Sequence, residues 1–334
     1  MTGLQTLKIR GFKCFQDASI ELDDFTVLVG LNGSGKSAFI DVLKFLVEFA
    51  HEGAEVPLLR RGGFSSVVYD RASYISFELN SCYRIEITPD GISEVLIGEE
   101  KKVVRLKNRW YSGVWGDTHL LSENEQSIKK FPYTIGFFDI QPYFIKKMSV
   151  LEGNSLKEDG SNLSHVLSGI LADSDKKREF LLLVRDFLPY VEDVKVEYSP
   201  VSTAYSFVIK DKLAGKDIPL GSVSDGTVMV IALVVALYFS PYEILVFDEP
   251  TRYIHPSLIP RLIDHLQSIS HEKQVIMTTH VPSVLTYVNI DNVRLFSRDA
   301  DGSKIYKVSD LDYIKVFLEG GLTLADLFAD GVLI

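Results

Sequence analysis

The chain has 334 residues, 46% of them hydrophobic and 24% charged, a composition that excludes general disorder and allows one large domain or two modest ones. Its 45 acidic and 35 basic residues give a net charge of −10, which excludes a generally basic nucleic-acid-binding surface and leaves only a local patch. Two cysteines, Cys14 and Cys82, are too few for a disulfide framework. The longest apolar run, 228–239, has 12 residues, fewer than the roughly 20 that span a bilayer. We therefore expect a cytoplasmic protein without membrane contact.

The hydrophobic pattern predicts both helices and strands. The predicted strands cover residues 6–10, 18–22, 25–29, 191–198, 204–210, 242–247, 274–278 and 293–296. The predicted helices cover residues 37–50, 162–188, 227–239 and 258–269. Between the first helix and the second, residues 64–107 alternate with period two, as in a β-meander. The helix–strand alternation of the last third is typical of a parallel sheet flanked by helices.

A glycine-rich turn lies between the third predicted strand and the first predicted helix. It matches the pattern G-x-x-x-x-G-K-[ST] in the required strand–turn–helix context, and its residues are Gly30, Leu31, Asn32, Gly33, Ser34, Gly35, Lys36 and Ser37. The glycines let backbone N–H groups surround phosphate oxygens at the positive end of the new helix. In such a loop Lys36 contacts the β- and γ-phosphates of a nucleotide, and the Ser37 hydroxyl binds Mg²⁺.

Two carboxylates end the apolar strand at 242–247. Such strands seldom end in charges unless those charges meet a cation or a reacting group. Asp248 is a candidate Mg²⁺ ligand, and Glu249 a candidate base for the water that attacks the γ-phosphate. A further apolar strand ends at His280, which is either a structural residue or a γ-phosphate sensor.

The segment Ser222–Thr227 stands directly before the buried helix at 227–239. Serine and aspartate at this position cap helices in many proteins. The segment stands some twenty residues before Asp248, and this spacing is what distinguishes it from an ordinary helix cap.

In this order the motifs resemble those of the ABC-type ATPases, and more narrowly those of the SMC/RecF/OLD-like branch with its AAA_21-type stand-alone members. The segment 30–37 resembles the Walker A loop, 223–227 the signature motif and 247–256 the Walker B motif with its D-loop. Thr279-His280 resembles the switch, 7–15 the opening strand of the branch, and 156–163 a segment familiar from the AAA_21 group.

The resemblance implies an ATPase that uses Mg²⁺ and ATP and closes as a head-to-tail dimer around them. Ser224, Gly226 and Thr227 of one subunit would then complete the γ-phosphate site of the other, while Lys36, Glu249 and His280 act in catalysis. ATP binding and hydrolysis would switch DNA binding, or a separate nuclease or toxin chain, in DNA repair or anti-phage defence. The resemblance also implies a glutamine loop, for which Gln141 is the candidate metal ligand.

Three features depart from the family pattern. Asp225 replaces the first glycine of the signature, and Gln141 is equally well an ordinary strand-end residue. The 186 residues between Lys36 and Val223 contain no heptad run for a coiled-coil arm, and too little chain follows His280 for a TOPRIM domain. Two alternatives to the ATP-driven switch stay open: a nucleotide-binding module with little turnover, and the ATP-binding subunit of an ABC transporter.

Two basic segments are candidates for partner contacts. Lys101–Arg109 has five basic residues in nine, followed by Trp110 and Tyr111, and is either a DNA contact or a solvated hairpin. Arg60-Arg61-Gly-Gly resembles the arginine loop of the branch, and is equally well the end of a helix.

We expect an α/β fold: the head of a P-loop ABC-type ATPase with a mixed sheet, an N-terminal β-rich lobe and an inserted helical subdomain. The expected parts are an N-terminal ATPase lobe (1–135), a helical insert (136–220), a lobe with signature, Walker B and switch histidine (221–310), and a C-terminal segment (311–334) that is either a docking segment or a packed end helix.

Overall fold

The computed structural model describes residues 3–70, 72–81, 83–89, 91–97, 102–104, 134–147, 149–150, 153–201 and 203–333. The chain forms two compact units, and each is described by itself. Unit 1 comprises residues 1–135 and 285–334, and unit 2 comprises residues 136–284. The four-part division expected from the sequence stays a prediction.

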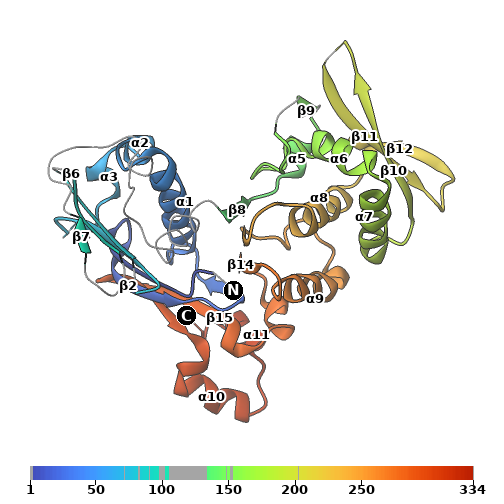
Figure 1. The fold of residues 1–334 in the computed structure, drawn as a ribbon. Coiled ribbons are helices and arrows are strands. Elements are labelled where there is room, and N and C mark those ends of the chain that lie inside the picture. The colour runs from blue at the N-terminus through green and yellow to red at the C-terminus, as the bar shows by residue number, and fades with distance from the viewer. Residues whose placement is uncertain are drawn as a thin grey trace. The chain divides into compact units, whose positions relative to one another are not determined.

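The described residues contain both strands and helices in the order in which the chain runs (Figure 1). The strands are β1 (Thr6–Phe12), β2 (Phe15–Glu21), β3 (Phe25–Gly30), β4 (Ile75–Leu79), β5 (Tyr83–Thr88), β6 (Gly91–Ile97), β7 (Lys102–Val104), β8 (Ile135–Phe138), β9 (Ser149–Val150), β10 (Val191–Ser199), β11 (Ala204–Asp211), β12 (Lys216–Pro219), β13 (Ile244–Phe247), β14 (Gln274–Thr278), β15 (Val293–Asp299) and β16 (Gly302–Lys307). The α-helices are α1 (Lys36–Glu52), α2 (Glu55–Arg60), α3 (Phe64–Val67), α5 (Pro142–Ile145), α6 (Leu163–Ala172), α7 (Ser174–Phe187), α8 (Asp225–Tyr238), α9 (Ile259–Ile269), α10 (Asp312–Glu319) and α11 (Leu324–Ala329).

Unit 1 contains an antiparallel sheet with the strand order β2-β1-β4-β5-β6-β7. In β1 and β5 buried side chains alternate with partly exposed ones, because one face of the sheet packs on the core and the other meets solvent. The predicted meander is confirmed in the described strands β4, β5 and β6, which pair antiparallel in chain order. Residues 64–67 form helix α3 instead of a strand.

A second sheet in unit 1 places the phosphate loop. Strand β15 pairs in parallel with β3 and antiparallel with β16, so this sheet is mixed, and the predicted α/β class with a mixed sheet is confirmed. All six residues of β3 are buried, as its continuous apolar run predicts. Helix α1 packs through Phe45 against Phe12 and Phe77, with ring centroids 5.8 and 5.5 Å apart. This aromatic cluster fixes the helix that starts at the phosphate loop.

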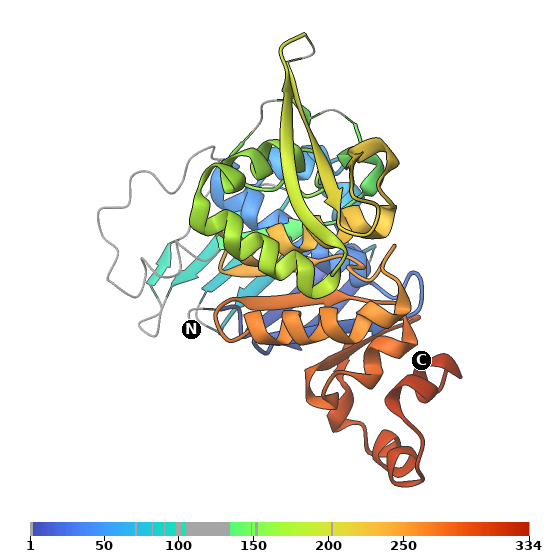
Figure 2. The ribbon, with the colours of Figure 1, turned by 90° about the vertical axis from the view of Figure 1, so that its right-hand side faces the viewer.

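Unit 2 contains the parallel pair β13 and β14, with β8 beside β13. All residues of both parallel strands are buried. Helix α8 is buried from Thr227 to Leu237, which is why its sequence is apolar on every side. The long antiparallel strands β10 and β11 form a hairpin against α6 and α7 (Figure 2).

A chain of hydrogen bonds ties three helices of unit 2 together. The hydroxyl of Tyr238 on α8 lies 2.5 Å from Nδ1 of His265 on α9, and Nε2 of that ring lies 2.9 Å from Asp186 on α7. Burial raises the pKa of Tyr238 to about 12, and the negative charges of Asp186 and Glu272 act in the same direction. The phenol therefore stays neutral, and the contact is structural.

None of the helices in the described part of the chain has the length and apolar character needed to cross a membrane.

Among the described residues of unit 1, the most deeply buried charged side chain is Arg294 on β15, which is 1% exposed. It donates to the carbonyl oxygens of Glu21 and Asp291, at 2.6 and 2.5 Å, and to the carboxylate of Asp23 at 2.7 Å. One side chain thus links β15 to the end of β2 and to the turn before β3.

We expect Arg294→Met to lower the free energy of unfolding by about 2–4 kcal/mol, because two carbonyl oxygens lose a donor from a fully buried guanidinium and its partly buried ion pair with Asp23 is broken. Urea denaturation followed by circular dichroism measures the change. The exposed Arg298 on the same strand provides the control, and Arg298→Met should stay within about 0.5 kcal/mol of the parent. Equal effects of the two substitutions would contradict the role given to Arg294.

Candidate nucleotide site

In unit 1 the loop from Gly30 to Gly35 joins β3 to α1, in the strand–loop–helix arrangement that the sequence predicts. Two of its glycines are required by close contacts. A Cβ atom on Gly30 would lie 2.2 Å from the carbonyl oxygen of Phe296, and one on Gly35 would lie 2.8 Å from Oγ of Ser303. Both glycines also have positive φ, 144° and 114°. The neighbouring strands β15 and β16 therefore impose the glycine pattern from behind the loop.

The loop has the features of a phosphate cradle. Lys36 is the first residue of α1, and its Nζ donates to the carbonyl oxygens of Gly30 and Leu31 at 2.7 and 3.0 Å. Helix α1 has no side-chain cap and no acidic residue in its first turn, so nothing there competes with an anion for the positive helix end. Oγ of Ser34 is buried and has no hydrogen-bond partner among the described residues. An orphaned hydroxyl inside such a loop fits a phosphate group.

The Mg²⁺ candidate of this loop, Ser37, is exposed at the start of α1, as are Leu31, Asn32 and Gly33. The described residues contain no group of three His, Cys, Asp or Glu side chains that could hold a metal ion by itself. In nucleotide sites Mg²⁺ takes one or two protein oxygens and completes its shell with phosphate oxygens and water, so a hydroxyl at the position of Ser37 suits it without a cluster of acidic residues.

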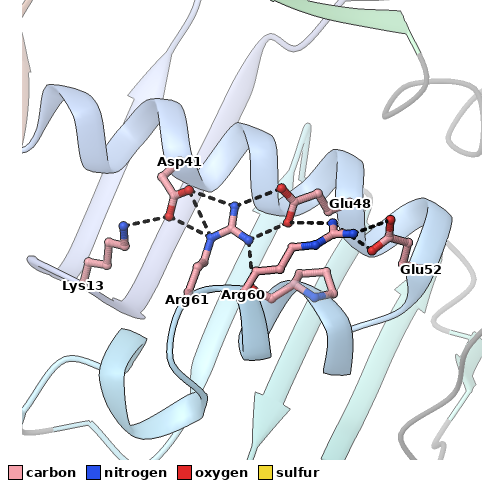
Figure 3. Close-up of polar contacts among 7 residues, drawn as sticks. Lys13, Asp41, Glu48, Glu52, Arg60 and Arg61 are labelled. Carbon is pink, nitrogen blue, oxygen red and sulfur yellow. Dashed lines mark hydrogen bonds and ion pairs between the residues drawn. The ribbon is translucent and has the colours of Figure 1, made fainter. Parts of the chain in front are cut away.

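Along α1, a cluster of charged side chains fixes the helix (Figure 3). The nearly buried guanidinium of Arg61 donates to Asp41 at 2.8–3.0 Å and to Glu48 at 2.5 Å, and Lys13 contacts Asp41 at 2.8 Å. Arg60 pairs with Glu52 at 2.9 Å. The two arginines of the predicted arginine loop therefore bind carboxylates of their own unit.

In unit 2 the parallel pairing of β13 and β14 brings together the polar residues that follow each strand. Thr278, the last residue of β14, donates through Oγ1 to Asp248 at 2.5 Å and accepts a hydrogen bond from the backbone N–H of Glu249 at 3.0 Å. Glu249 has a φ of 52°, a conformation uncommon for a residue with a side chain, and the Thr278 contact holds it there. One threonine thus positions both carboxylates.

The Glu249 carboxylate has one buried oxygen that no described residue satisfies. Its Oε1 is buried, has no hydrogen-bond partner among the described residues, and lies 3.7 Å from Nε2 of His280. A buried carboxylate oxygen that accepts no hydrogen bond is available to a reacting group. Glu249 and His280, predicted from separate strands, therefore lie side by side.

The segment that resembles the signature begins α8. Ser224 is the N-cap residue, and its Oγ accepts from the N–H of Thr227 at 3.2 Å. The hydroxyl of Thr227 lies 2.6 Å from that of Tyr190. At Gly226 a Cβ atom would lie 2.8 Å from the carbonyl oxygen of Tyr253 in the D-loop segment, so this glycine is required by a close backbone approach.

Asp225, the departure from the family pattern, forms an ion pair with Lys146 just after α5 (2.6 Å). Its side chain is 53% exposed, and it stands in the first turn of α8, where a negative charge stabilises the helix. The lysine compensates the charge that the aspartate adds at this helix end.

Gln141 follows β8 at the N-terminus of α5, and its side-chain amide donates to Asp139 at 2.6 Å. The 156–163 segment lies against the same stretch, since the N–H groups of Asp139 and Gln141 donate to the carbonyl oxygens of Glu158 and Asp159. The metal role of Gln141 stays a prediction.

Several residues of these sites were not predicted from the sequence. The sequence gives a weak indication of a role for Thr278, because this residue stands next to Thr279-His280 at the end of an apolar strand. The sequence gives no indication of the contacts of Tyr190 and Lys146, because their partners are distant in the chain. The basic run Lys101–Arg109 lies outside the described residues except for Lys102–Val104 in β7, so its role stays open.

Two family models match the chain. The AAA_21 model, described as "AAA domain, putative AbiEii toxin, Type IV TA system", matches residues 104–286. The AAA_15 model, described as "AAA ATPase domain", matches residues 3–178. Each covers more than half of the chain.

Solved structures of SMC head domains have a similar fold. A crystal structure of an Smc head bound to the C-winged helix domain of ScpA is 18% identical, covers 91% of this chain and 97% of its own, and has a TM-score of 0.61. A Pyrococcus furiosus Smc head with an extended coiled coil, bound to the C-terminal domain of ScpA, is 16% identical and covers 96% and 100%, with a TM-score of 0.59. The Thermotoga maritima SMC head is 15% identical and covers 91% and 98%, with a TM-score of 0.53. At these identities the likeness shows the fold.

The charged cluster along α1 makes the free energy of unfolding depend on pH. Burial alone would raise the pKa of Asp41, but hydrogen bonds from Arg61 and Lys13 outweigh it and hold the pKa below its ordinary value of 3.8. The folded chain thus binds this proton more weakly than the unfolded chain. The stabilisation is complete above the ordinary value and is lost as the pH falls through the lower folded value.

We therefore expect Asp41→Asn to lower the free energy of unfolding at pH 7 and to flatten its decline between about pH 5 and pH 3. Urea denaturation over this pH range measures both effects. The exposed Asp24 of the same unit provides the matched control, and Asp24→Asn should leave the pH profile as in the parent. An unchanged profile in Asp41→Asn would contradict the assignment.

Proposed function

The chain belongs to the AAA_21 and AAA_15 families of ATPase domains and is an ABC-type P-loop ATPase with the fold of an SMC head, and we propose that it hydrolyses ATP as a dimerising molecular switch. The observation that carries this proposal is the Glu249 carboxylate, whose buried Oε1 has no hydrogen-bond partner in the part of the chain that the structure describes and lies 3.7 Å from Nε2 of His280. Burying a carboxylate oxygen without a hydrogen bond destabilises the fold, and a module that only bound ATP would not require such an oxygen.

Each residue of the proposed reaction has one task. The loop 30–37 binds the phosphates through backbone N–H groups, and Lys36 neutralises the β- and γ-phosphate charge. Ser37 and Asp248 would hold Mg²⁺, and Gln141 would be a further ligand. Mg²⁺, when bound, supplies a positive charge for the developing negative charge of the transferred phosphoryl group. Glu249 accepts the proton of the attacking water, and His280 donates to the γ-phosphate.

We propose further that two copies close head-to-tail around ATP. The N-terminus of α8, with Ser224, Gly226 and Thr227, then completes the γ-phosphate site of the other copy, since a helix N-terminus supplies a positive dipole end and backbone donors. ATP binding joins the copies, and hydrolysis releases them. Such a cycle fits a switch better than a metabolic enzyme.

The switch is proposed to gate DNA binding or a separate nuclease or toxin chain, in DNA repair or anti-phage defence. The SMC head solved with a domain of ScpA is an example of a head of this fold that holds a partner protein. A transporter subunit fits less well, because the long insertion between Lys36 and Val223 exceeds what such subunits carry.

The first test is the mass of Glu249→Gln in solution by light scattering, without nucleotide, with Mg·ADP and with Mg·ATP. Removal of the base should trap the ATP-bound dimer, so we expect a doubled mass with Mg·ATP alone. ATP turnover should fall by a factor of roughly 100 or more. Lys36→Met is the matched control, which should bind ATP poorly and stay monomeric.

A monomer under every condition would contradict the two-headed site. A dimer that persists in every nucleotide state would place the switch in a change of shape within the dimer. Full turnover in Glu249→Gln would contradict its role as the base.

The Asp225–Lys146 pair gives a second test of the dimer. Without Lys146, the Asp225 charge would repel the phosphates bound at the same helix end. We expect Lys146→Ala, in the Glu249→Gln background, to weaken ATP-driven dimerisation roughly five- to tenfold, after allowance for solvent screening. Asp225→Gly should restore dimerisation in the Lys146→Ala protein, as measured by light scattering against protein concentration. A double variant as weak as Lys146→Ala would contradict this electrostatic account.

A further inference from the structure

Helix α10 makes little contact with the other described residues of unit 1. Of its eight residues only Ile314 is buried. No side chain caps its N-terminus. In both views α10 lies at the periphery of unit 1 (Figures 1 and 2). A helix of this length is marginal in water by itself, because most helix stability comes from packing of an apolar face.

One face of α10 carries large apolar side chains in solvent. Tyr313, Val316 and Phe317 are 45%, 67% and 39% exposed, and their spacing of three and four residues places them side by side. Leu322, 42% exposed, follows in the turn after the helix, where its N–H donates to the carbonyl oxygen of Phe317. We call these four residues the α10 face. Clustered exposed aromatic and aliphatic side chains are typical of binding surfaces.

The chain segment that carries the α10 face is acidic. Residues 308–333 contain five acidic residues and one basic residue, Lys315, and all six are exposed. Lys315 is itself paired with Asp312 at 3.0 Å. The net charge of −4 around an apolar face restricts what can cover it.

This charge excludes several occupants. Nucleic acid and anionic lipid surfaces would be repelled. A second copy docking through the same face would set one acidic surface against another. A positively charged protein segment with an apolar stripe satisfies both the charge and the hydrophobic face.

We propose that the α10 face is the docking site for a basic amphipathic helix of a different protein chain. Its apolar stripe would cover Tyr313, Val316, Phe317 and Leu322, and flanking lysine or arginine residues would meet the acidic rim. This inference deepens the partner role in the proposed function by naming a surface and a partner chemistry. The docking contact itself requires no nucleotide.

The test uses a fluorescein-labelled synthetic 14-residue peptide made of leucine and lysine, with the leucines at helical spacing. Fluorescence anisotropy with the full chain, without nucleotide, should show binding that weakens with added salt. Val316→Ser/Phe317→Ser should weaken it at least tenfold. Both side chains are exposed, so the melting temperature should stay close to that of the parent.

Two controls make the test specific. The pair Leu182→Ser/Leu213→Ser replaces two apolar residues of unit 2 that are also exposed, by 62% and 85%, and should bind the peptide like the parent. A peptide with glutamate in place of lysine should bind at least tenfold more weakly. Unchanged binding by Val316→Ser/Phe317→Ser, or equal binding of the two peptides, would overturn the proposal.

The mass of the nucleotide-free chain in solution tests independently whether a second copy covers the α10 face. A dimer that dissociates in Val316→Ser/Phe317→Ser would mean that a second copy covers the α10 face, and would also overturn the proposal. Because no arm involves ATP, failure here is distinct from failure of the ATP-driven dimer.

Discussion

The parallel pairing of β13 with β14 is the constraint on which the proposed chemistry in unit 2 depends. Parallel strands end at the same edge of a sheet, so the residues after Phe247 and after Met277 meet there. Thr278 turns this proximity into a defined geometry, since one hydroxyl contacts Asp248 and the backbone of Glu249. The strained φ of Glu249 is then a consequence of the arrangement that aims its carboxylate toward His280.

In unit 1 the phosphate loop depends on its surroundings in a comparable way. The glycine pattern is typical of a loop that binds phosphate. Gly30 and Gly35 are also required because a Cβ atom at either position would lie too close to Phe296 or Ser303 on the neighbouring strands. A motif match in sequence therefore reflects two constraints at once. The same loop must approach a ligand on one side and neighbouring strands on the other, and only glycine satisfies both.

The sequence predicted well what depends on local pattern. The buried strands β3, β13 and β14 follow from continuous apolar runs. The contacts that join distant segments were not predictable, because nothing in a single sequence pairs Lys146 with Asp225 or Tyr190 with Thr227. The α3 turn at 64–67 was expected as strand, since four residues are too few for periodicity to separate helix from strand.

The arginine pair shows how structure changes the interpretation of charge. In sequence, Arg60 and Arg61 suit contact with a phosphate backbone, but both guanidinium groups bind carboxylates of α1. A phosphate would have to replace Asp41, Glu48 or Glu52, at the expense of the contacts that hold the helix carrying Lys36. Together with the acidic surroundings of α10 and the net charge of −10, this favours a protein over a nucleic acid as the partner of the described surface.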